Sequence, residues 1–205
     1  PEFPQLVLLV SGGHTELNLV SDHLQYKHLG GTLDDAAGEA FDKVARMLNL
    51  SYPGGPSVQK AARDGNPEAY HFPRSRLDGT WNFSFSGLKT AVLREVKMLE
   101  KTTLNLPVAN LAASFQAAVV DVLISKTMHA AREFGVKSIL VAGGVSANHA
   151  LREAFTSQKE FAVHIPPLSL CTDNAAMIAA AGYFHYCAGQ IDPLDLDVLP
   201  TWPLS

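Results

Sequence analysis

The stretch Leu9-Val10-Ser11-Gly12-Gly13-His14-Thr15 decides the fold, because it places a glycine turn at the end of an apolar run. Residues 5–10 predict a buried β-strand, and residues 16–20 predict a second strand that returns from the turn. Two adjacent glycines allow the backbone to approach a ligand closely and to direct N–H groups at an anion. The same pattern is also typical of an ordinary Gly-Gly hairpin. The turn alone leaves both interpretations open.

A second apolar run, residues 138–142, also ends in two glycines, Gly143 and Gly144. A helix is predicted to follow from about Asn148 to Phe155, so that N–H groups of both turns could converge on a phosphate at a helix N-terminus. Neither turn has the spacing of a P-loop or of a GxGxxG fingerprint. The second turn favours the ligand-binding interpretation of the first turn over an ordinary hairpin.

The first half of the chain predicts a meander of three short strands followed by a helix. Residues 25–29 form the third strand, and Gly30-Gly31 is expected to break it. Asp34 or Asp35 is expected to cap the helix, which ends near Asn49. A rigid turn at 51–56 leads into a short helix with Pro56 at its first position.

The second half predicts an insertion and then alternating strands and helices. Residues 66–85 are irregular and carry aromatic side chains, and a helix to about Lys101 follows them. The longest helix is predicted from Pro107 to Phe134. A strand at 137–141, the helix at 148–155 and a strand at 161–165 follow it. The chain ends with a helix from Asp173 or Asn174 to Cys187 and a Pro-containing tail at 192–205. The element order is βββαβαβα with an insertion after the first helix, which indicates an α/β fold with a parallel sheet and crossover helices.

Composition excludes several classes of protein. The 205 residues are 47% hydrophobic and 18% charged, enough for one large domain or two small ones. Because no uninterrupted apolar stretch approaches the roughly 20 residues of a membrane span and the start carries no secretory signal, we expect a cytoplasmic protein without membrane contact. Cys171 and Cys187 are expected at the start and end of one helix, too far apart for a disulfide.

The net charge of −4 argues against a surface that binds nucleic acid by bulk charge. One predicted helix nevertheless carries Arg94, Lys97 and Lys101 on a single face at helical spacing. This basic stripe is either a solvated helix face or a contact surface for the phosphates of a nucleic acid.

Three polar residues have both a structural and a functional interpretation. Asp42 is a solvated helix position or a ligand contact, and Asn148 is a helix N-cap or a hydrogen-bonding partner of a ribose or base. Asp173 is an N-cap or, because it follows a strand-to-helix connection, a carboxylate ligand for a hard cation or iron. No nucleophile-base set, zinc-protease motif or pair of histidines at helical ligand spacing is present.

Six motifs, in this order, resemble the TsaD family of tRNA adenosine threonylcarbamoyltransferases, formerly called O-sialoglycoprotein endopeptidases, in its bacterial or organellar branch. They are Ser11-Gly12-Gly13-His14-Thr15, the stretch from Asp34 to Lys43, Tyr52-Pro53-Gly54-Gly55-Pro56, Phe83-Ser84-Phe85-Ser86-Gly87-Leu88-Lys89-Thr90, the stretch from Ala142 to Asn148, and Cys171-Thr172-Asp173-Asn174.

The resemblance implies the actin, sugar-kinase and heat-shock-chaperone ATPase fold, of which residues 1–205 would be the second, C-terminal lobe with an insertion at about 51–104. It implies one divalent metal ion with Asp173 as a ligand, in the first place iron with zinc or magnesium as alternatives, and no organic cofactor. It assigns no catalytic residue. The residues implied to contact the adenylate substrate are Leu9, Val10, Ser11, Gly12, Gly13, Asp42, Gly55 and Asn148.

The implied activity is transfer of a threonylcarbamoyl group from threonylcarbamoyl-AMP to the exocyclic amine of the adenosine next to the anticodon, in tRNAs that read codons beginning with A. The implied protein partners are TsaB-like and TsaE-like. The chain departs from the family because a HxxxH metal-binding pair and the first lobe, both expected before Ser11, are missing. We therefore expect a fragment that is inactive alone. The alternatives are a sugar kinase or chaperone-like ATPase of the same superfamily, and a non-catalytic lobe that recruits partners.

Overall fold

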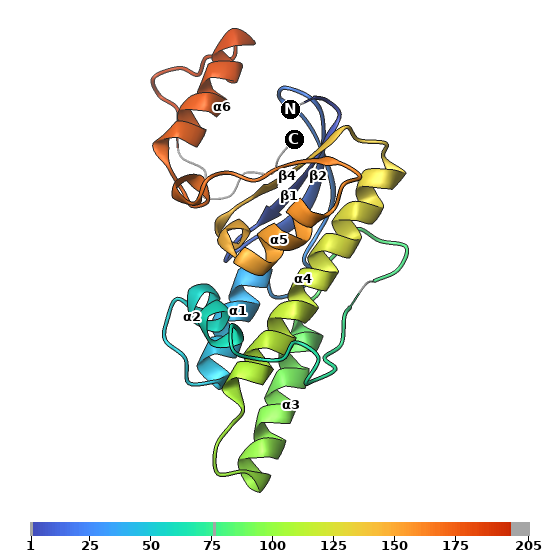
Figure 1. The fold of residues 1–205 in the computed structure, drawn as a ribbon. Helices are drawn as coiled ribbons and strands as arrows, with labels where there is room; N and C mark the ends of the chain where they lie inside the picture. Colours follow the sequence, from blue (N-terminus) through green and yellow to red (C-terminus); the bar gives the residue numbers. More distant parts are fainter. Residues whose placement is uncertain (1, 76, 198–205) are drawn as a thin grey trace.

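The computed structural model describes residues 2–75 and 77–197, and its framework is a five-stranded mixed sheet in the order β3-β2-β1-β4-β5 (Figure 1). β1 pairs antiparallel with β2 and parallel with β4, so the sheet combines the predicted meander with the predicted parallel half. The strands are β1 (Gln5–Val10), β2 (Thr15–Asp22), β3 (Gln25–Gly31), β4 (Ser138–Ala142) and β5 (Ala162–His164).

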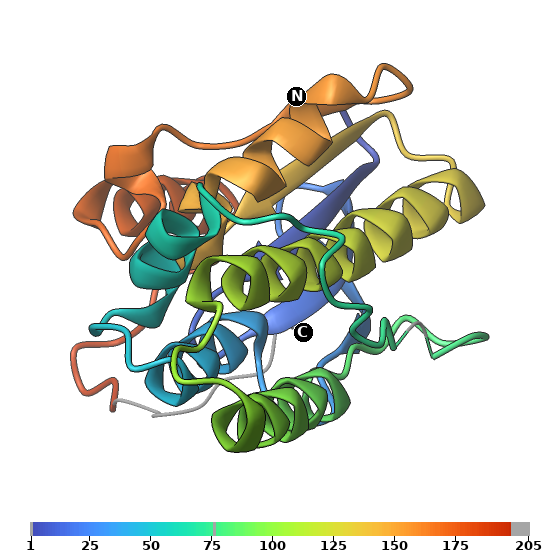
Figure 2. The ribbon, with the colours of Figure 1, turned by 60° about the horizontal axis from the view of Figure 1, so that its bottom comes forward.

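Helices follow the strands in the predicted order, with the two helices of the predicted insertion before the longest one. In Figure 2, α4 runs between α5 on one side and α3 on the other, and it packs against both as well as against α2 and β1. The helices are α1 (Ala37–Met47), α2 (Gly54–Ala62), α3 (Ser86–Thr102), α4 (Val108–Glu133), α5 (His149–Ser157) and α6 (Ala175–Cys187), with 3-10 turns η1 (Gly144–Ala147) and η2 (Leu168–Leu170).

The core lies between the sheet and the helices. Leu6 and Leu8 of β1 are fully buried, and so are Phe115 of α4 and Phe155 of α5. Within the described residues, α4 alone is long and apolar enough, by length and composition, to cross a membrane. Because 56% of its most apolar window is buried inside the protein, α4 is the core helix of the domain.

The strand β3 is not broken at Gly30-Gly31, as the sequence led us to expect. Both glycines continue the strand and pair with Leu17 and Glu16 of β2. A Cβ atom on Gly30 would lie 2.6 Å from the backbone carbon of Trp81. The glycine is therefore required by the close approach of the insertion, which the local sequence does not show.

Helix α1 begins at Ala37, and neither Asp34 nor Asp35 caps it. The N–H of Ala37 donates instead to Oγ1 of Thr15, at 2.9 Å. Because Thr15 ends the first glycine turn, this hydrogen bond fixes the start of α1 beside that turn. The carboxylate of Glu39 accepts the N–H of Ala36 at 3.4 Å and completes the helix start.

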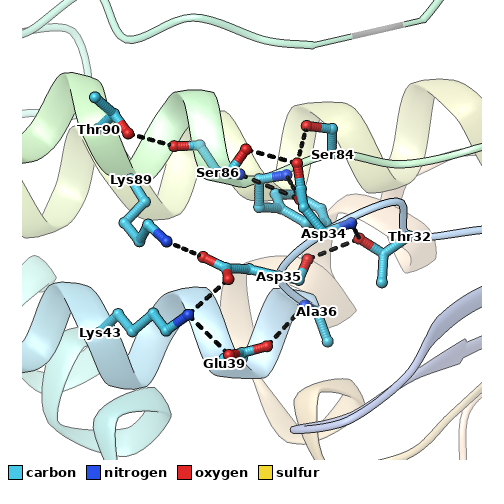
Figure 3. Close-up of polar contacts among 11 residues, drawn as sticks. Thr32, Asp34, Asp35, Ala36, Glu39, Lys43, Ser84, Ser86, Lys89 and Thr90 are labelled. Carbon is cyan, nitrogen blue, oxygen red and sulfur yellow. Dashed lines mark hydrogen bonds and ion pairs between the residues drawn. The ribbon is translucent and has the colours of Figure 1, made fainter.

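Asp34 caps α3, fifty residues further along the chain (Figure 3). One carboxylate oxygen accepts the N–H groups of Phe85 and Ser86, at 2.8 and 3.3 Å, and the other accepts the hydroxyls of Ser84 and Ser86. Burial raises the pKa of Asp34, but these hydrogen bonds outweigh it and hold the pKa below the usual 3.8.

Asp35 joins the same two helices through ion pairs. Its carboxylate lies 2.6 Å from Nζ of Lys43 on α1 and 2.6 Å from Nζ of Lys89 on α3 (Figure 3). Burial raises its pKa, but the two lysines outweigh this effect and lower the pKa. The hydrogen bonds of Asp34 and the ion pairs of Asp35 therefore hold α3, which follows the motif around Phe85, against the segment that supports the first glycine turn.

Two smaller expectations also change. Pro56 is the third residue of α2, since the helix begins at Gly54. Cys171 is buried ahead of α6 and does not start it, and both cysteines are free.

The helix α6 stands apart from the sheet in Figure 1, and the Phe184 ring stacks on His23 with centroids 3.8 Å apart. The predicted tail is described only to residue 197, and residues 198–205 lie outside the described part.

Replacing Asp34 with alanine is expected to lower the free energy of unfolding by about 1–2 kcal/mol at pH 7, because the start of α3 loses its cap. A carboxylate with a lowered pKa stabilises the folded state above its unfolded-state pKa, and this contribution is lost as the pH falls through the folded-state pKa. Urea unfolding should therefore show a large difference between wild type and Asp34→Ala at neutral pH and a smaller one at about pH 3. A difference independent of pH would contradict the capping role.

Candidate functional site

Two cavities meet at the carboxyl ends of β1 and β4. The larger one, about 1210 Å³, is lined by both glycine turns, the end of β5 and the segment before α6. The smaller one, about 410 Å³, lies between α1, α2 and the start of α5. Gly12 and Gly144 line both cavities, so the two cavities adjoin at the glycine turns.

The structure brings nearly all predicted site residues to these cavities. Val10 is the exception, because its side chain is fully buried and only its backbone lies near the turn. The residues that line the larger cavity include Leu9, Ser11, Gly12, Gly13 and Asp173, and those that line the smaller one include Gly12, Asp42, Gly55 and Asn148.

The first glycine turn satisfies most of its own polar groups. Oγ of Ser11 accepts the N–H groups of Gly13 and His14 at 3.3 and 3.0 Å, and the N–H of Ser11 donates to the His14 carbonyl. The N–H of Gly12 has no hydrogen-bond partner among the described residues. The turn therefore offers a ligand one free N–H group rather than a row of them.

The second turn depends on glycine for steric reasons. Gly143 has a φ of +95°, and a Cβ atom there would lie 2.4 Å from the carbonyl oxygen of Val10. The chain then forms the 3-10 turn η1 before α5 begins at His149. The N–H groups of Gly144 and Val145 open η1 and have no partner inside it, which leaves them available to an anion.

Asp42 is half-buried rather than solvated. Its Oδ1 accepts the N–H of Gly54 at 2.7 Å and so caps α2, whose N-cap residue Pro53 has no side-chain acceptor. A Cβ atom on Gly54 would lie 2.5 Å from Cα of Asp42, so the two helices touch at this point. Its Oδ2 has no partner in the described part of the chain and is free to accept from a ligand in the smaller cavity.

Asn148 caps α5 and also lies on the wall of the smaller cavity. Its Oδ1 accepts the N–H of Leu151 at 3.1 Å, which confirms the N-cap. Its Nδ2 donates to Oε1 of Gln116 on α4 at 2.8 Å. Because the residue also lines the smaller cavity, a second Nδ2–H remains for a ligand.

Gln59 is a polar residue of the smaller cavity that the sequence reasoning missed. Its Oε1 accepts the N–H of His149 at 2.6 Å, so its side-chain amide nitrogen is left as a donor beside Asp42 and Asn148. The sequence held a signal for this residue: Gln59 lies four residues after Gly55, a predicted site residue, and residues four apart share one face of a helix.

Asp173 is exposed in the loop between η2 and α6, and Asn174, not Asp173, caps α6. The described residues contain no group of three or more His, Cys, Asp or Glu side chains that could hold a metal ion. A structural or catalytic metal normally needs at least three protein ligands. The donor set of the described part of the chain therefore does not make a metal site by itself, and Asp173 supplies at most one carboxylate.

The TsaD family model, described as tRNA N6-adenosine threonylcarbamoyltransferase, matches residues 1–180. Relatives of the same description from Dehalococcoides mccartyi and Thermomicrobium roseum are 56% and 50% identical over 98% and 100% of the chain. The chain covers 60% and 61% of these two relatives, both bacterial.

Two solved structures share the fold at low sequence identity. HypF from T. kodakarensis superposes with a TM-score of 0.57 at 19% identity, over 83% of this chain and 22% of that one. The activator of 2-hydroxyisocaproyl-CoA dehydratase from Clostridium difficile, with bound ADPNP, gives 0.50 at 10% identity, over 96% and 66%. These similarities and the mixed five-stranded sheet agree with the predicted lobe of the actin, sugar-kinase and chaperone ATPase type.

Replacing Gly143 with alanine is expected to lower the free energy of unfolding by about 2–4 kcal/mol, because it adds both backbone strain and a clash with Val10. The matched control is Gly13→Ala, since a Cβ atom on Gly13 would meet nothing within 4 Å. Urea unfolding of the two variants measures the difference. Equal, small effects would show that the close approach of β1 to the second turn is not a constraint.

Proposed function

The chain belongs to the TsaD family of tRNA N6-adenosine threonylcarbamoyltransferases, and from this membership we propose that it acts as the second lobe of an enzyme that transfers a threonylcarbamoyl group from threonylcarbamoyl-AMP to tRNA. The acceptor is the exocyclic amine of the adenosine next to the anticodon, in tRNAs that read codons beginning with A. The observation that carries the proposal is the junction of two cavities at Gly12 and Gly144.

The junction suits an adenylate because such a ligand has three parts. We place its phosphate at the free N–H groups of Gly12 and Gly144, where an anion is stabilised by backbone dipoles. The adenosine then occupies the smaller cavity, whose 410 Å³ is within the usual range of ligand pockets. The threonylcarbamoyl group projects into the larger cavity, which is open to an incoming tRNA base.

In the smaller cavity, acceptor and donor groups match a nucleoside. The free Oδ2 of Asp42 accepts a hydrogen bond from a ribose hydroxyl. The free N–H groups of Gln59 and Asn148 donate to oxygen or nitrogen acceptors of the ribose or base. Each of the three side chains accepts an N–H group at the start of α2 or α5, and this hydrogen bond orients it before the ligand arrives.

The reaction forms a bond between the adenosine nitrogen and the carbonyl carbon, breaks the bond from that carbon to the phosphate oxygen, releases AMP and frees one proton. The residues of this chain orient the adenylate and stabilise the negative charge on the departing phosphate. Burial of the nucleotide in the smaller cavity also keeps water from the phosphate end. We assign no general base.

The metal and the partners complete the proposal. Asp173 supplies one carboxylate to a divalent metal, iron by resemblance, whose other ligands are outside this donor set.

The cellular setting is the cytoplasm, with TsaB-like and TsaE-like protein partners. Since the chain spans about 60% of the length of its relatives, we propose that it does not catalyse the transfer alone.

The basic stripe is the proposed tRNA-binding surface. Arg94, Lys97 and Lys101 are all exposed on α3, the helix that Asp34 and Asp35 clamp beside the first glycine turn. Their side chains are free to neutralise phosphates in spite of the acidic net charge of the chain.

Replacing Asp42 with asparagine is expected to weaken the binding of AMP by about 10- to 100-fold. The asparagine oxygen can still accept the N–H of Gly54, so α2 stays capped while the acceptor for the ribose hydroxyl is lost. Calorimetric titration of AMP measures the change, with Asp121→Asn on the outer part of α4 as the control. Unchanged affinity together with unchanged stability would reduce Asp42 to a helix cap.

Reversing the charge of Lys97 with Lys97→Glu is expected to weaken tRNA binding and to lower the slope of log affinity against log salt by about 0.7–0.9 for each phosphate that is no longer neutralised. The control Lys159→Glu makes the same change of charge in the exposed loop before β5. Filter binding at several salt concentrations measures both quantities. If the two variants behave alike, the stripe on α3 is only a solvated face.

A further inference from the structure

Gln116 is a polar side chain on an otherwise apolar stretch of α4. Its neighbours Phe115, Ala118 and Val119 are buried in the core, whereas Gln116 is half-buried beside the start of α5. Its Oε1 accepts a hydrogen bond from Nδ2 of Asn148 at 2.8 Å, across 32 residues of sequence. Helix packing alone does not require a glutamine here, because an apolar side chain of similar length would fill the same space.

The hydrogen bond from Asn148 to Gln116 decides how the Asn148 amide is oriented. A single hydrogen bond from Leu151 to Oδ1 fixes one point of the amide group, and the terminal torsion of asparagine has a broad energy minimum. A second hydrogen bond, at Nδ2, fixes the amide plane. The remaining Nδ2–H then has one direction, and the residue lies on the wall of the smaller cavity.

We propose that Gln116 is a positioning residue of the nucleotide site: by holding Nδ2 of Asn148, it orients the remaining N–H of that amide toward the bound adenosine. This inference rests on the proposed nucleotide site. Gln116 itself lines a separate hollow of about 480 Å³ together with Gln59 and His149 and does not line the smaller cavity. Its effect on the ligand therefore passes through Asn148.

The test compares three variants by calorimetric titration of AMP and by thermal unfolding. Gln116→Met keeps the length of the side chain but removes the acceptor, and is expected to weaken AMP binding about five- to tenfold. Gln116→Glu keeps an acceptor at the same place and is expected to bind AMP within about twofold of wild type. The control Thr127→Val removes a hydrogen bond to Leu123 on the same helix, far from the cavity, and should leave AMP affinity unchanged.

A second readout does not depend on the ligand. In ¹⁵N-labelled protein, the two side-chain N–H signals of Asn148 should be well separated and slow to exchange in wild type and Gln116→Glu. In Gln116→Met their separation should shrink toward that of an asparagine amide without a protein acceptor, although slow rotation about the amide bond keeps the two signals distinct. A residue that only fills space would lower the unfolding temperature without moving these signals.

The outcomes separate this proposal from the proposed function. Weaker AMP binding in Gln116→Met, restored in Gln116→Glu, supports the proposal, whereas equal AMP affinity in all variants overturns it. If wild type does not bind AMP, the nucleotide site itself fails in this chain, and the Asn148 signals then decide the positioning role. Signals that are the same in wild type and Gln116→Met would overturn that role as well.

Discussion

The parallel pairing of β1 with β4 is the constraint on which the rest of the structure depends. The register places Leu9 opposite Ala142, so both glycine turns leave the sheet at the same edge. The backbone of Gly143 lies so close to the carbonyl of Val10 that no other residue fits there. Open α/β sheets bind ligands at the carboxyl ends of their strands, and here the two glycine turns bring backbone N–H groups to that edge.

The polar residues of the smaller cavity also hold the surrounding helices in place. Asp42 caps α2, Asn148 caps α5, and Gln59 accepts the first N–H of α5. Each of these side chains uses one polar atom for the fold and leaves another for a ligand. Structural and functional interpretations of Asp42 and Asn148 are therefore not exclusive, and removing a whole side chain would lower stability and affinity together.

Apolar periodicity was sufficient to predict the strands of the sheet, the core helix α4 and the order of elements, because these depend on burial along continuous segments. Apolar periodicity could not predict contacts between segments that are distant in the sequence. Asp34 caps a helix fifty residues away, the backbone of Trp81 lies too close to Gly30 for a side chain to fit there, and Gln116 accepts a hydrogen bond across 32 residues. The motifs identified most of the residues that line the candidate site. The pattern of hydrogen-bond donors and acceptors among them could be seen only in the structure.

The central claim is that the two glycine turns and the smaller cavity form one nucleotide site. Titration of AMP into ¹⁵N-labelled protein, followed by amide NMR, tests it most directly. The account predicts that the backbone signals of Gly12, Gly144 and Val145 shift together with the side-chain signals of Gln59 and Asn148, along a single saturating curve. Shifts confined to other parts of the chain, or none at millimolar AMP, would contradict it.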